Sequence, residues 1–271
     1  MTLDPIRDVV LPPLPRAPTQ EAWDAMTPAQ RVAAEEALPL SLPVEHIVHR
    51  GMAEGDEHSE TRFVVRDTLR RWFRSRERNV YVGSDIAVYY PGEEMVTPDA
   101  FAVRDVPTHD RLSWMVSKER KGVEWAFEVL MRGSRVKDLK KNVARYAALG
   151  MLEYFVFDLR TRRIQAWRQA SPGVRQFVPV VPVQGAFASQ VLGLELLVVG
   201  RKVRFRQGTS ELLTTDDLIV RLEETVAELA VRVEEQEIRA EEEAARAEGL
   251  ERELAAVREE LARLRGQGGT P

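Results

Sequence analysis

One acidic residue interrupts an apolar, strand-like run in the middle of the chain. Glu128 lies within WAFEVL, residues 125–130, where every other side chain is apolar. A carboxylate that is buried without a partner costs several kcal/mol or takes a shifted pKa. The run therefore predicts that a partner for Glu128 lies elsewhere in the fold, and the identity of that partner decides the chemistry.

A second acid lies upstream, at the start of another apolar run. Asp99 follows Pro98 in VTPDAFAV, and the proline favours an extended backbone at this point. Two carboxylates on neighbouring strands can converge on one divalent cation, and oxygen ligands of this kind suit Mg²⁺ or Mn²⁺ rather than zinc. Acids at strand ends are common, so the spacing alone leaves open whether this pair binds a metal.

Composition excludes several other kinds of site. The 271 residues contain no cysteine, which removes disulfides, thiol catalysis and thiolate metal sites. The four histidines form no HExxH pattern, so a zinc site is not expected. The net charge of −4 means that nucleic-acid binding would need a local basic surface. No signal-like start and no apolar stretch approaching about 18 residues is present, so we expect a cytoplasmic protein with no membrane partner.

The chain divides into three segments and a tail. Residues 1–44 form a proline-rich N-terminal extension with one short helix, TPAQRVAAEEAL, whose start has the pattern of a capping box. Residues 45–207 alternate helical and strand-like runs and form the main domain. Residues 216–265 carry a heptad pattern, and 266–271 are expected to be a flexible tail.

The main domain combines two predicted helices with a series of predicted strands. In DEHSETRFVVRDTLRRWFRSR, the apolar positions at helical spacing are Val65, Leu69, Trp72 and Phe73. A second helix, VKDLKKNVARYAALG, ends at Gly150. The predicted strands are short β-branched and aromatic runs bounded by turn residues: VYVG, IAVYY, AFAV, VEWAFEVL, EYFVFD, RIQAW and QFVPVVPV. The pattern predicts an α/β domain with a mixed sheet flanked by helices.

The heptad segment predicts a C-terminal coiled-coil helix, because its seam residues recur at alternating spacings of three and four. The seam is weak at Gln236 and Glu243 and strong at both ends. A lone helix of this kind exposes its seam, so we expect a parallel homodimer, with a helix folded back on its own domain as the open alternative. The seam residues are Leu222, Val226, Leu229, Val233, Gln236, Ala240, Glu243, Ala247, Leu250, Leu254, Val257, Leu261 and Leu264.

The order and spacing of the motifs resemble the Uma-type putative restriction endonuclease family, which belongs to the PD-(D/E)XK nuclease superfamily. The resemblance is carried by PD at 98–99, EVL at 128–130, Asp138, Tyr146 and the run GMLEYFVFD. It extends through GSDIAVYYPGEEMVTPDAFAV before the site and FASQVLGLELLV after it, and covers roughly residues 45–206.

The resemblance implies a restriction-endonuclease-like core that hydrolyses phosphodiester bonds in DNA. It implies that Asp99, Glu128 and the backbone carbonyl of Val129 bind Mg²⁺ or Mn²⁺. In this chemistry the metal activates a water, stabilises the charge that develops on the phosphate and orients the scissile bond.

The sequence departs from the family's pattern at the lysine that normally positions or deprotonates the attacking water. The third position of E-x-K is Leu130, and the helix position that often carries the lysine, four residues after Asp138, is Asn142. On an α-helix Lys141 is rotated about 100° from Asn142, toward solvent, and Lys140 lies on the opposite flank. We therefore place Asn142 with the two carboxylates in the catalytic set, as the group that would position the nucleophile.

A basic cluster lies beside the proposed site and is a candidate phosphate-binding surface in an otherwise acidic chain. A solvated helix face explains the same residues. The cluster consists of Arg132, Arg135, Lys137, Lys140, Lys141 and Arg145. A second basic stripe, with a spacing of four, consists of Arg62, Arg66, Arg70 and Arg74.

Two further polar residues have open roles. His58 precedes the first helix of the main domain and either caps, packs or acts on substrate. Glu124 shares a strand face with Glu128 and is expected to be a salt-bridge partner, with a place in the metal site as the alternative.

We therefore expect a Mg²⁺-dependent DNA endonuclease that dimerises through its coiled coil. The competing hypothesis is a catalytically impaired nuclease-fold scaffold or nucleic-acid-binding protein, in which the coiled coil recruits a partner. RNA as the substrate is not separable from DNA at this stage, because the metal chemistry is shared.

Overall fold

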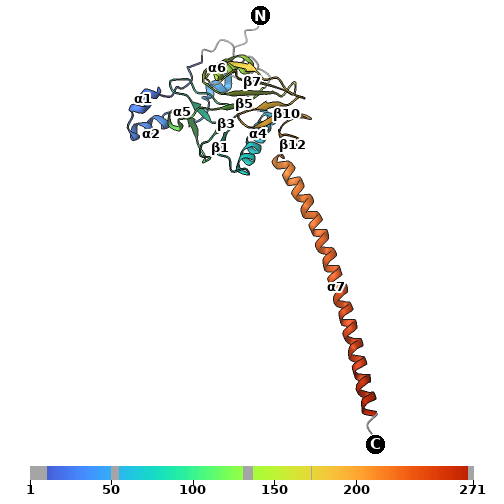
Figure 1. Ribbon diagram of the computed structural model, residues 1–271. Helices are drawn as coiled ribbons and strands as arrows, with labels where there is room; N and C mark the ends of the chain where they lie inside the picture. Colours follow the sequence, from blue (N-terminus) through green and yellow to red (C-terminus); the bar gives the residue numbers. More distant parts are fainter. Residues whose placement is uncertain (1–10, 50–54, 131–136, 172, 268–271) are drawn as a thin grey trace. The chain divides into compact units, whose positions relative to one another are not determined.

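The computed structural model divides into two compact units, Met1–Thr215 and Asp216–Pro271 (Figure 1). Within the described ranges, no helix combines the length and the apolar composition needed to cross a membrane. The residues that the structure describes are 11–49, 55–130, 137–171 and 173–267.

A six-stranded mixed sheet forms the centre of the first unit, so the predicted mixed α/β fold is confirmed. The pair β5–β6 is parallel and the other neighbours are antiparallel. Every residue of β5 and β6 is buried, as expected for strands that are covered on both faces. The strands, in spatial order, are β1 (Val80–Gly83), β3 (Ala100–Arg104), β5 (Trp125–Leu130), β6 (Glu153–Asp158), β7 (Arg163–Gln169) and β8 (Phe177–Pro179).

Helices cover both faces of this sheet, and the strand period of two assigns each β5 side chain to one face. On one face α4 (Asp56–Arg74) buries three of the four predicted apolar positions, Val65, Leu69 and Phe73, in the same cluster as Phe127. The fourth, Trp72, is partly buried against this cluster. On the other face α6 (Asn142–Ala148) contributes Tyr146 to a second cluster. The alternate residues of β5, including Glu128, face this second cluster.

A second, four-stranded antiparallel sheet completes the cluster around α4. Its strands, in spatial order, are β12 (Ser210–Glu211), β11 (Lys202–Gln207), β10 (Leu194–Val199) and β9 (Phe187–Ser189). These strands were not predicted from the sequence. A parallel pair, β2 (Ala87–Tyr89) with β4 (Ser113–Met115), lies outside both sheets, and α5 (Val116–Glu119) follows it.

The proline-rich N-terminal segment belongs to the first unit and packs on it. It contains two helices, α1 (Gln20–Ala25) and α2 (Pro28–Glu36), where one was expected, and α3 (Val44–His49) begins at its last residue. The capping box of α2 is confirmed, with Thr27 N–H donating to Gln30 Oε1 (2.8 Å) and Gln30 N–H donating to Thr27 Oγ1 (3.3 Å). Trp23 is 3% exposed and shares a cluster with Tyr89 and Met115, so the segment supports the domain rather than trailing from it.

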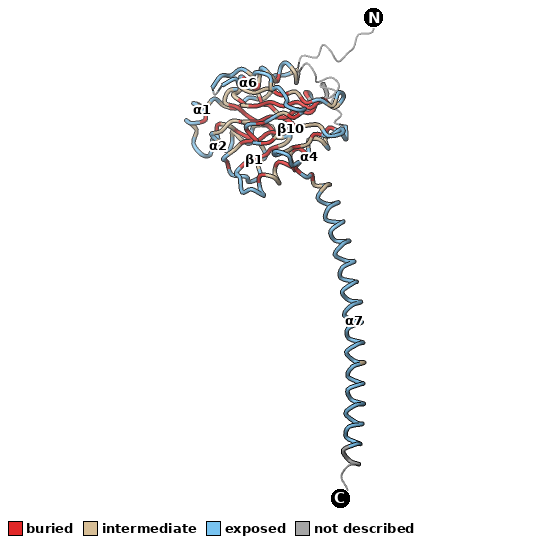
Figure 2. Tube along the Cα trace, turned by 45° about the vertical axis from the view of Figure 1, so that its right-hand side comes forward, coloured by how far each residue is buried: buried red, intermediate tan, exposed pale blue. Residues whose placement is uncertain are grey.

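The described residues of the second unit, 216–267, all belong to one helix, α7 (Thr215–Gln267). Its predicted seam side chains are all exposed, as the colouring in Figure 2 also shows. Two ion pairs at a spacing of four, Glu235–Arg239 (3.9 Å) and Glu248–Arg252 (3.2 Å), support the isolated helix.

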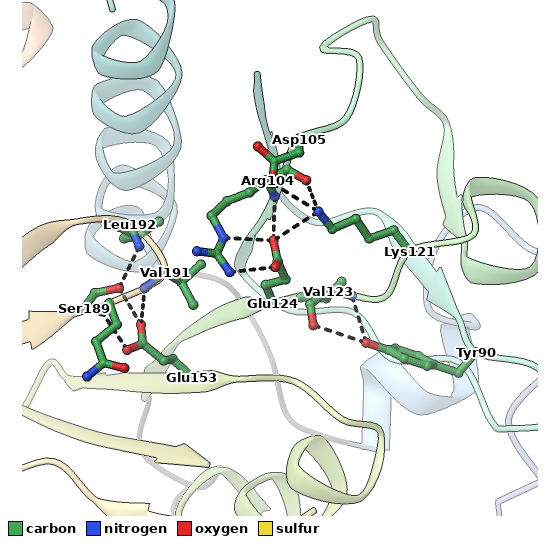
Figure 3. A network of polar contacts seen from close by, with 11 residues as sticks. Tyr90, Arg104, Asp105, Lys121, Val123, Glu124, Glu153, Ser189, Val191 and Leu192 are labelled. Carbon is green, nitrogen blue, oxygen red and sulfur yellow. Dashed lines mark hydrogen bonds and ion pairs between the residues drawn. The ribbon is translucent and has the colours of Figure 1, made fainter. Parts of the chain in front are cut away.

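Glu153 ties the two sheets together at the start of β6 (Figure 3). Its carboxylate is 2% exposed and accepts hydrogen bonds from Ser189 Oγ (2.5 Å) and from the N–H groups of Gln190 (2.8 Å) and Val191 (3.4 Å). The side chain of Arg168 lies 3.4 Å away. The turn after β9 is thus anchored by one buried acid.

We expect Glu153→Ala to lower the free energy of unfolding by about 2–4 kcal/mol, because it leaves several buried donors unsatisfied. The matched control is Glu195→Ala, which removes the half-exposed pair with Arg206 (2.9 Å) and should cost less than about 1 kcal/mol. Urea denaturation of both variants measures the difference. Equal losses would contradict the anchoring role.

Candidate active site

The two acids predicted from the sequence lie opposite each other on neighbouring strands. In the antiparallel register Ala100 pairs with Phe127, and continuing by one residue sets Asp99 opposite Glu128. Residues that are opposite share a sheet face, and like charges in this position repel. Both are buried, with Asp99 8% and Glu128 4% exposed, so the pair requires hydrogen-bond donors and a proton or a cation.

Asp99 is held by one side chain and one backbone group. Its Oδ2 accepts a hydrogen bond from Val129 N–H (2.7 Å) and lies 3.2 Å from Nε2 of His58. His58 is 1% exposed and lies in the first turn of α4. His58 therefore contacts the first of the two carboxylates.

The pKa of Asp99 lies below its ordinary value. Burial acts to raise this pKa, but the hydrogen bond and charge of His58, the Val129 N–H and a hydrogen bond from Glu128 together outweigh it. Asp99 is thus ionised at neutral pH. This is the protonation state in which a carboxylate binds a cation.

Glu128 is held by two neutral donors from the next helical segment. Its Oε1 accepts hydrogen bonds from Tyr146 Oη (2.7 Å) and, more weakly, from Asn142 Nδ2 (3.4 Å). Both donors are buried. Tyr146 also packs edge-to-face on Tyr154, with ring centroids 5.0 Å apart. Tyr146 and Asn142 are therefore part of the partner that the sequence predicted for Glu128.

Sequence analysis counted Tyr146 only as a core residue and a family motif position. The signal for its role is the hydroxyl, because a tyrosine buried on an apolar helix face normally finds a hydrogen-bond partner.

The backbone of Val129 adjoins the carboxylate pair. Its N–H donates to Asp99 Oδ2 (2.7 Å). In a strand the carbonyl of a residue points to the same side as its N–H, so the expected carbonyl ligand lies on the Asp99 side of β5.

These donors fit a hard divalent cation in type, with two carboxylates and one carbonyl oxygen. Across the described ranges, no three His, Asp or Glu side chains are grouped so as to hold a metal ion. A bound cation would therefore rely on the Val129 carbonyl and on water for its remaining ligands.

The helix that carries Asn142 differs from the expected one. We expected a continuous α-helix, but η1 (Lys137–Lys141) is a π-helix and α6 starts only at Asn142. A π-turn has more residues per turn than an α-helix, so the α-helical offset between Lys141 and Asn142 does not apply. The outcome is the same for these residues, since Lys140 and Lys141 are exposed and Asn142 is 5% exposed.

The predicted phosphate-binding cluster is only partly described. Arg132 and Arg135, and the side chain of Lys137, lie outside the described residues. Arg145 donates to the backbone carbonyls of Glu94 (2.7 Å) and Met95 (3.2 Å). Its guanidinium thus contacts the loop before β3, and not Glu128.

Two arginines of the second basic stripe make polar contacts within the domain. Arg62 pairs with Asp85 (3.1 Å), and Arg70 Nε donates to the carbonyl of Val82 (2.8 Å). These two arginines therefore help to position α4 against the sheet.

Glu124 is a salt-bridge partner, as expected. Its carboxylate pairs with the Arg104 guanidinium (2.8 Å), accepts from Arg104 N–H (2.7 Å) and lies 3.9 Å from Lys121 (Figure 3). It lies four residues from Glu128, about 13 Å along the strand, so it is separate from the carboxylate pair.

Residues 40–199 match the model of the Uma2 family, described as a putative restriction endonuclease. The match spans more than half of the chain, and the chain belongs to this family.

Solved structures add a weak similarity. A chain described as a putative nuclease belonging to DUF820, from Anabaena variabilis, is 14% identical with a TM-score of 0.38. The similarity covers 49% of this chain and 74% of that one, and at this level it supports no further conclusion. No curated protein matched the chain.

We expect Tyr146→Phe to destabilise the protein by about 1–3 kcal/mol, because a buried oxygen of Glu128 loses its hydrogen bond while the ring stays packed. In a Glu128→Gln background the same change should cost about 1 kcal/mol less, as contacting groups do not act additively. Thermal or urea unfolding of the four proteins in this cycle measures the coupling. Additive costs would show that the contact contributes nothing.

Proposed function

We propose that the protein is a Mg²⁺- or Mn²⁺-dependent DNA endonuclease that works as a homodimer joined through α7. The observation that carries the proposal is the apposition of Asp99 and Glu128, two buried carboxylates on adjacent strands, in a chain of the Uma2 family. Two buried acids facing each other form a poor structural pair but a good cation site.

Each residue around the pair has a definite task in this proposal. Asp99 and Glu128, with the Val129 carbonyl, would hold the cation. His58 and the Val129 N–H fix one carboxylate, while Tyr146 and Asn142 fix the other. When bound, a divalent cation supplies a more acidic water and neutralises charge on the scissile phosphate.

Asn142 occupies the position at which the family often carries a lysine. This replacement determines how fast we expect the protein to cleave DNA. An amide donates hydrogen bonds but does not take a proton at neutral pH. In this chain it orients the Glu128 oxygen and the attacking water, without acting as a base. The proposed enzyme is therefore a slow one.

The proposed substrate is duplex DNA. The exposed lysines Lys140 and Lys141 adjoin the buried Asn142 along the chain, where they would contact the phosphate backbone. RNA has the same scissile linkage, and the cleavage test below uses both polymers. We include a cytoplasmic location in this proposal.

Purified protein should nick supercoiled plasmid in Mg²⁺ or Mn²⁺, whereas Asp99→Ala and Glu128→Ala should be at least about 100-fold slower, since each removes a cation ligand. Gel electrophoresis over hours measures the conversion to open-circular and linear forms. The matched control is Glu124→Ala, on the same strand but in a separate salt bridge, which should keep activity.

No cleavage of DNA or RNA by the wild type, with DNA still bound, would contradict the enzyme. That result would favour the second candidate, a nuclease-fold scaffold. Two observations support this candidate: Asn142 in place of lysine, and a long helix with an exposed apolar seam.

A lysine introduced at position 142 should raise the rate of DNA cleavage. We expect Asn142→Lys to accelerate plasmid cleavage by about 10–100-fold, because a positioned lysine can take the proton of the attacking water. Ala144→Lys adds the same charge to the exposed side of the same helix and should change the rate less than about threefold. Equal acceleration by both would mean that added charge improves DNA binding alone.

A further inference from the structure

We propose that α7 pairs with α7 of a second copy in a parallel, in-register coiled coil, and that charges flanking the seam specify this arrangement. The inference deepens the homodimer of the proposed function and rests on it. It concerns which orientation and register the helix selects, and it follows from the residues on either side of the seam.

The seam forms a solvent-exposed apolar stripe along α7, which pairing with a second helix would bury. Its leucines and valines are about half exposed or more, from 48% at Leu261 to 63% at Leu222 and 64% at Leu264. Each heptad places one seam residue at position a and the next, three residues later, at position d. By this assignment Val233 and Leu254 are a residues, and Leu250 and Val257 are d residues.

The flanking positions carry a regular charge pattern. Position g precedes each a residue and position e follows each d residue, and in a parallel pair each g faces the e five residues later on the other helix. Between positions 225 and 258, three such pairs are oppositely charged: Arg232 with Glu237, Arg246 with Glu251, and Glu253 with Arg258. By symmetry each occurs twice. The two other g–e pairs between positions 225 and 258 each include an alanine, Ala230 or Ala244, and none is a like-charge pair.

Other arrangements bring like charges together. A slip by one heptad sets Arg246 against Arg258 and Glu253 against Glu251. In the antiparallel arrangement that keeps the whole seam together, Ala240 faces Glu243, and Arg239 then faces Arg246 twice. Like charges at these positions oppose pairing. Each alternative also keeps attractive pairs, such as Arg239 with Glu251 in the slipped pair and Arg232 with Glu253 in the antiparallel one. The in-register parallel pair has the most opposite-charge flanking pairs and no like-charge one, so the pattern favours it.

Arg239, at a g position, is also compatible with the parallel, in-register pair. Arg239 would face Ala244 across the seam, and instead it pairs with Glu235 on its own helix (3.9 Å). The parallel pair does set Glu243 against its own copy at a d position. Arg239 and Arg246 lie four residues before and three after Glu243, on the same helix face, so each glutamate has cations beside it.

Parallel pairing fixes where the two domains are attached. Each α7 follows directly on the first unit at Thr215, so both domains join the coiled coil at the same end. Two nuclease sites attached at one end suit two cuts in one duplex.

Two sets of charge reversals test the pairing in the full-length protein. The g set is Arg232→Glu, Arg246→Glu and Glu253→Arg, and the e set is Glu237→Arg, Glu251→Arg and Arg258→Glu. Each set alone turns all six pairs repulsive and should weaken homodimerisation at least about tenfold. Mixed together, the two proteins restore all six attractive pairs, so a heterodimer should form with near wild-type affinity, as measured by sedimentation and by co-purification through two different tags.

The orientation of the two α7 helices can be tested independently by disulfide cross-linking. Because the chain contains no cysteine, a single introduced cysteine can cross-link only with its counterpart in the second copy. Leu250→Cys alone should form a disulfide between two copies, since a d residue faces itself in the parallel pair. In the antiparallel pair residue 250 faces residue 233, and only a mixture of Leu250→Cys and Val233→Cys would cross-link. Cross-linking of the single variant supports the inference.

A monomeric wild type, an antiparallel cross-link, or charge sets that do not recover on mixing would each overturn the inference. These readouts are independent of cleavage. A protein that pairs in this way but does not cut nucleic acid supports the pairing and contradicts the nuclease, while a monomer that cuts does the reverse.

Discussion

Two buried carboxylates that face each other across adjacent strands are the constraint on which the rest of the site depends. At an effective dielectric constant near 20, two like charges about 4 Å apart repel by about 4 kcal/mol. Hydrogen bonds from Tyr146, Asn142 and the Val129 N–H stabilise the individual oxygens, but neutral donors do not cancel the mutual repulsion. A proton or a cation does so, and the charge of His58 beside Asp99 already offsets part of the repulsion.

The surrounding elements follow from that constraint. The start of α4 brings His58 to Asp99, and the residues after η1 bring Asn142 and Tyr146 to Glu128. The sheet supplies the register, because β3 begins immediately after Asp99 while β5 continues past Glu128. The lowered pKa of Asp99 shows that this environment favours the ionised carboxylate even though it is buried. An ionised, preformed carboxylate at the end of a rigid sheet is what a hard cation requires.

Much of this could be predicted from the sequence because local rules and tertiary packing agree. The capping box at Thr27, the buried face of α4 and the strands around Asp99 and Glu128 are strong local patterns, and each is present. The four-stranded second sheet was missed because its strands are short or half-exposed, with alternation as their only signal. The π-turn of η1 and the Tyr146–Glu128 hydrogen bond were not predictable, since both depend on how the helical segment docks on the sheet. Trp23 likewise shows its role only once its distant partners Tyr89 and Met115 are known.

The central claim is that Asp99 and Glu128 together bind a divalent cation, and isothermal titration of the metal-free protein with Mn²⁺ tests it most directly. Glu128→Gln keeps the size of the side chain and removes its charge, and Glu124→Gln makes the same change on the same strand outside the site. We predict one site per chain in the wild type and in Glu124→Gln, with affinity at least tenfold weaker in Glu128→Gln because a charged ligand is lost. Equal Mn²⁺ affinity in all three proteins, or no binding in the wild type, would contradict the account.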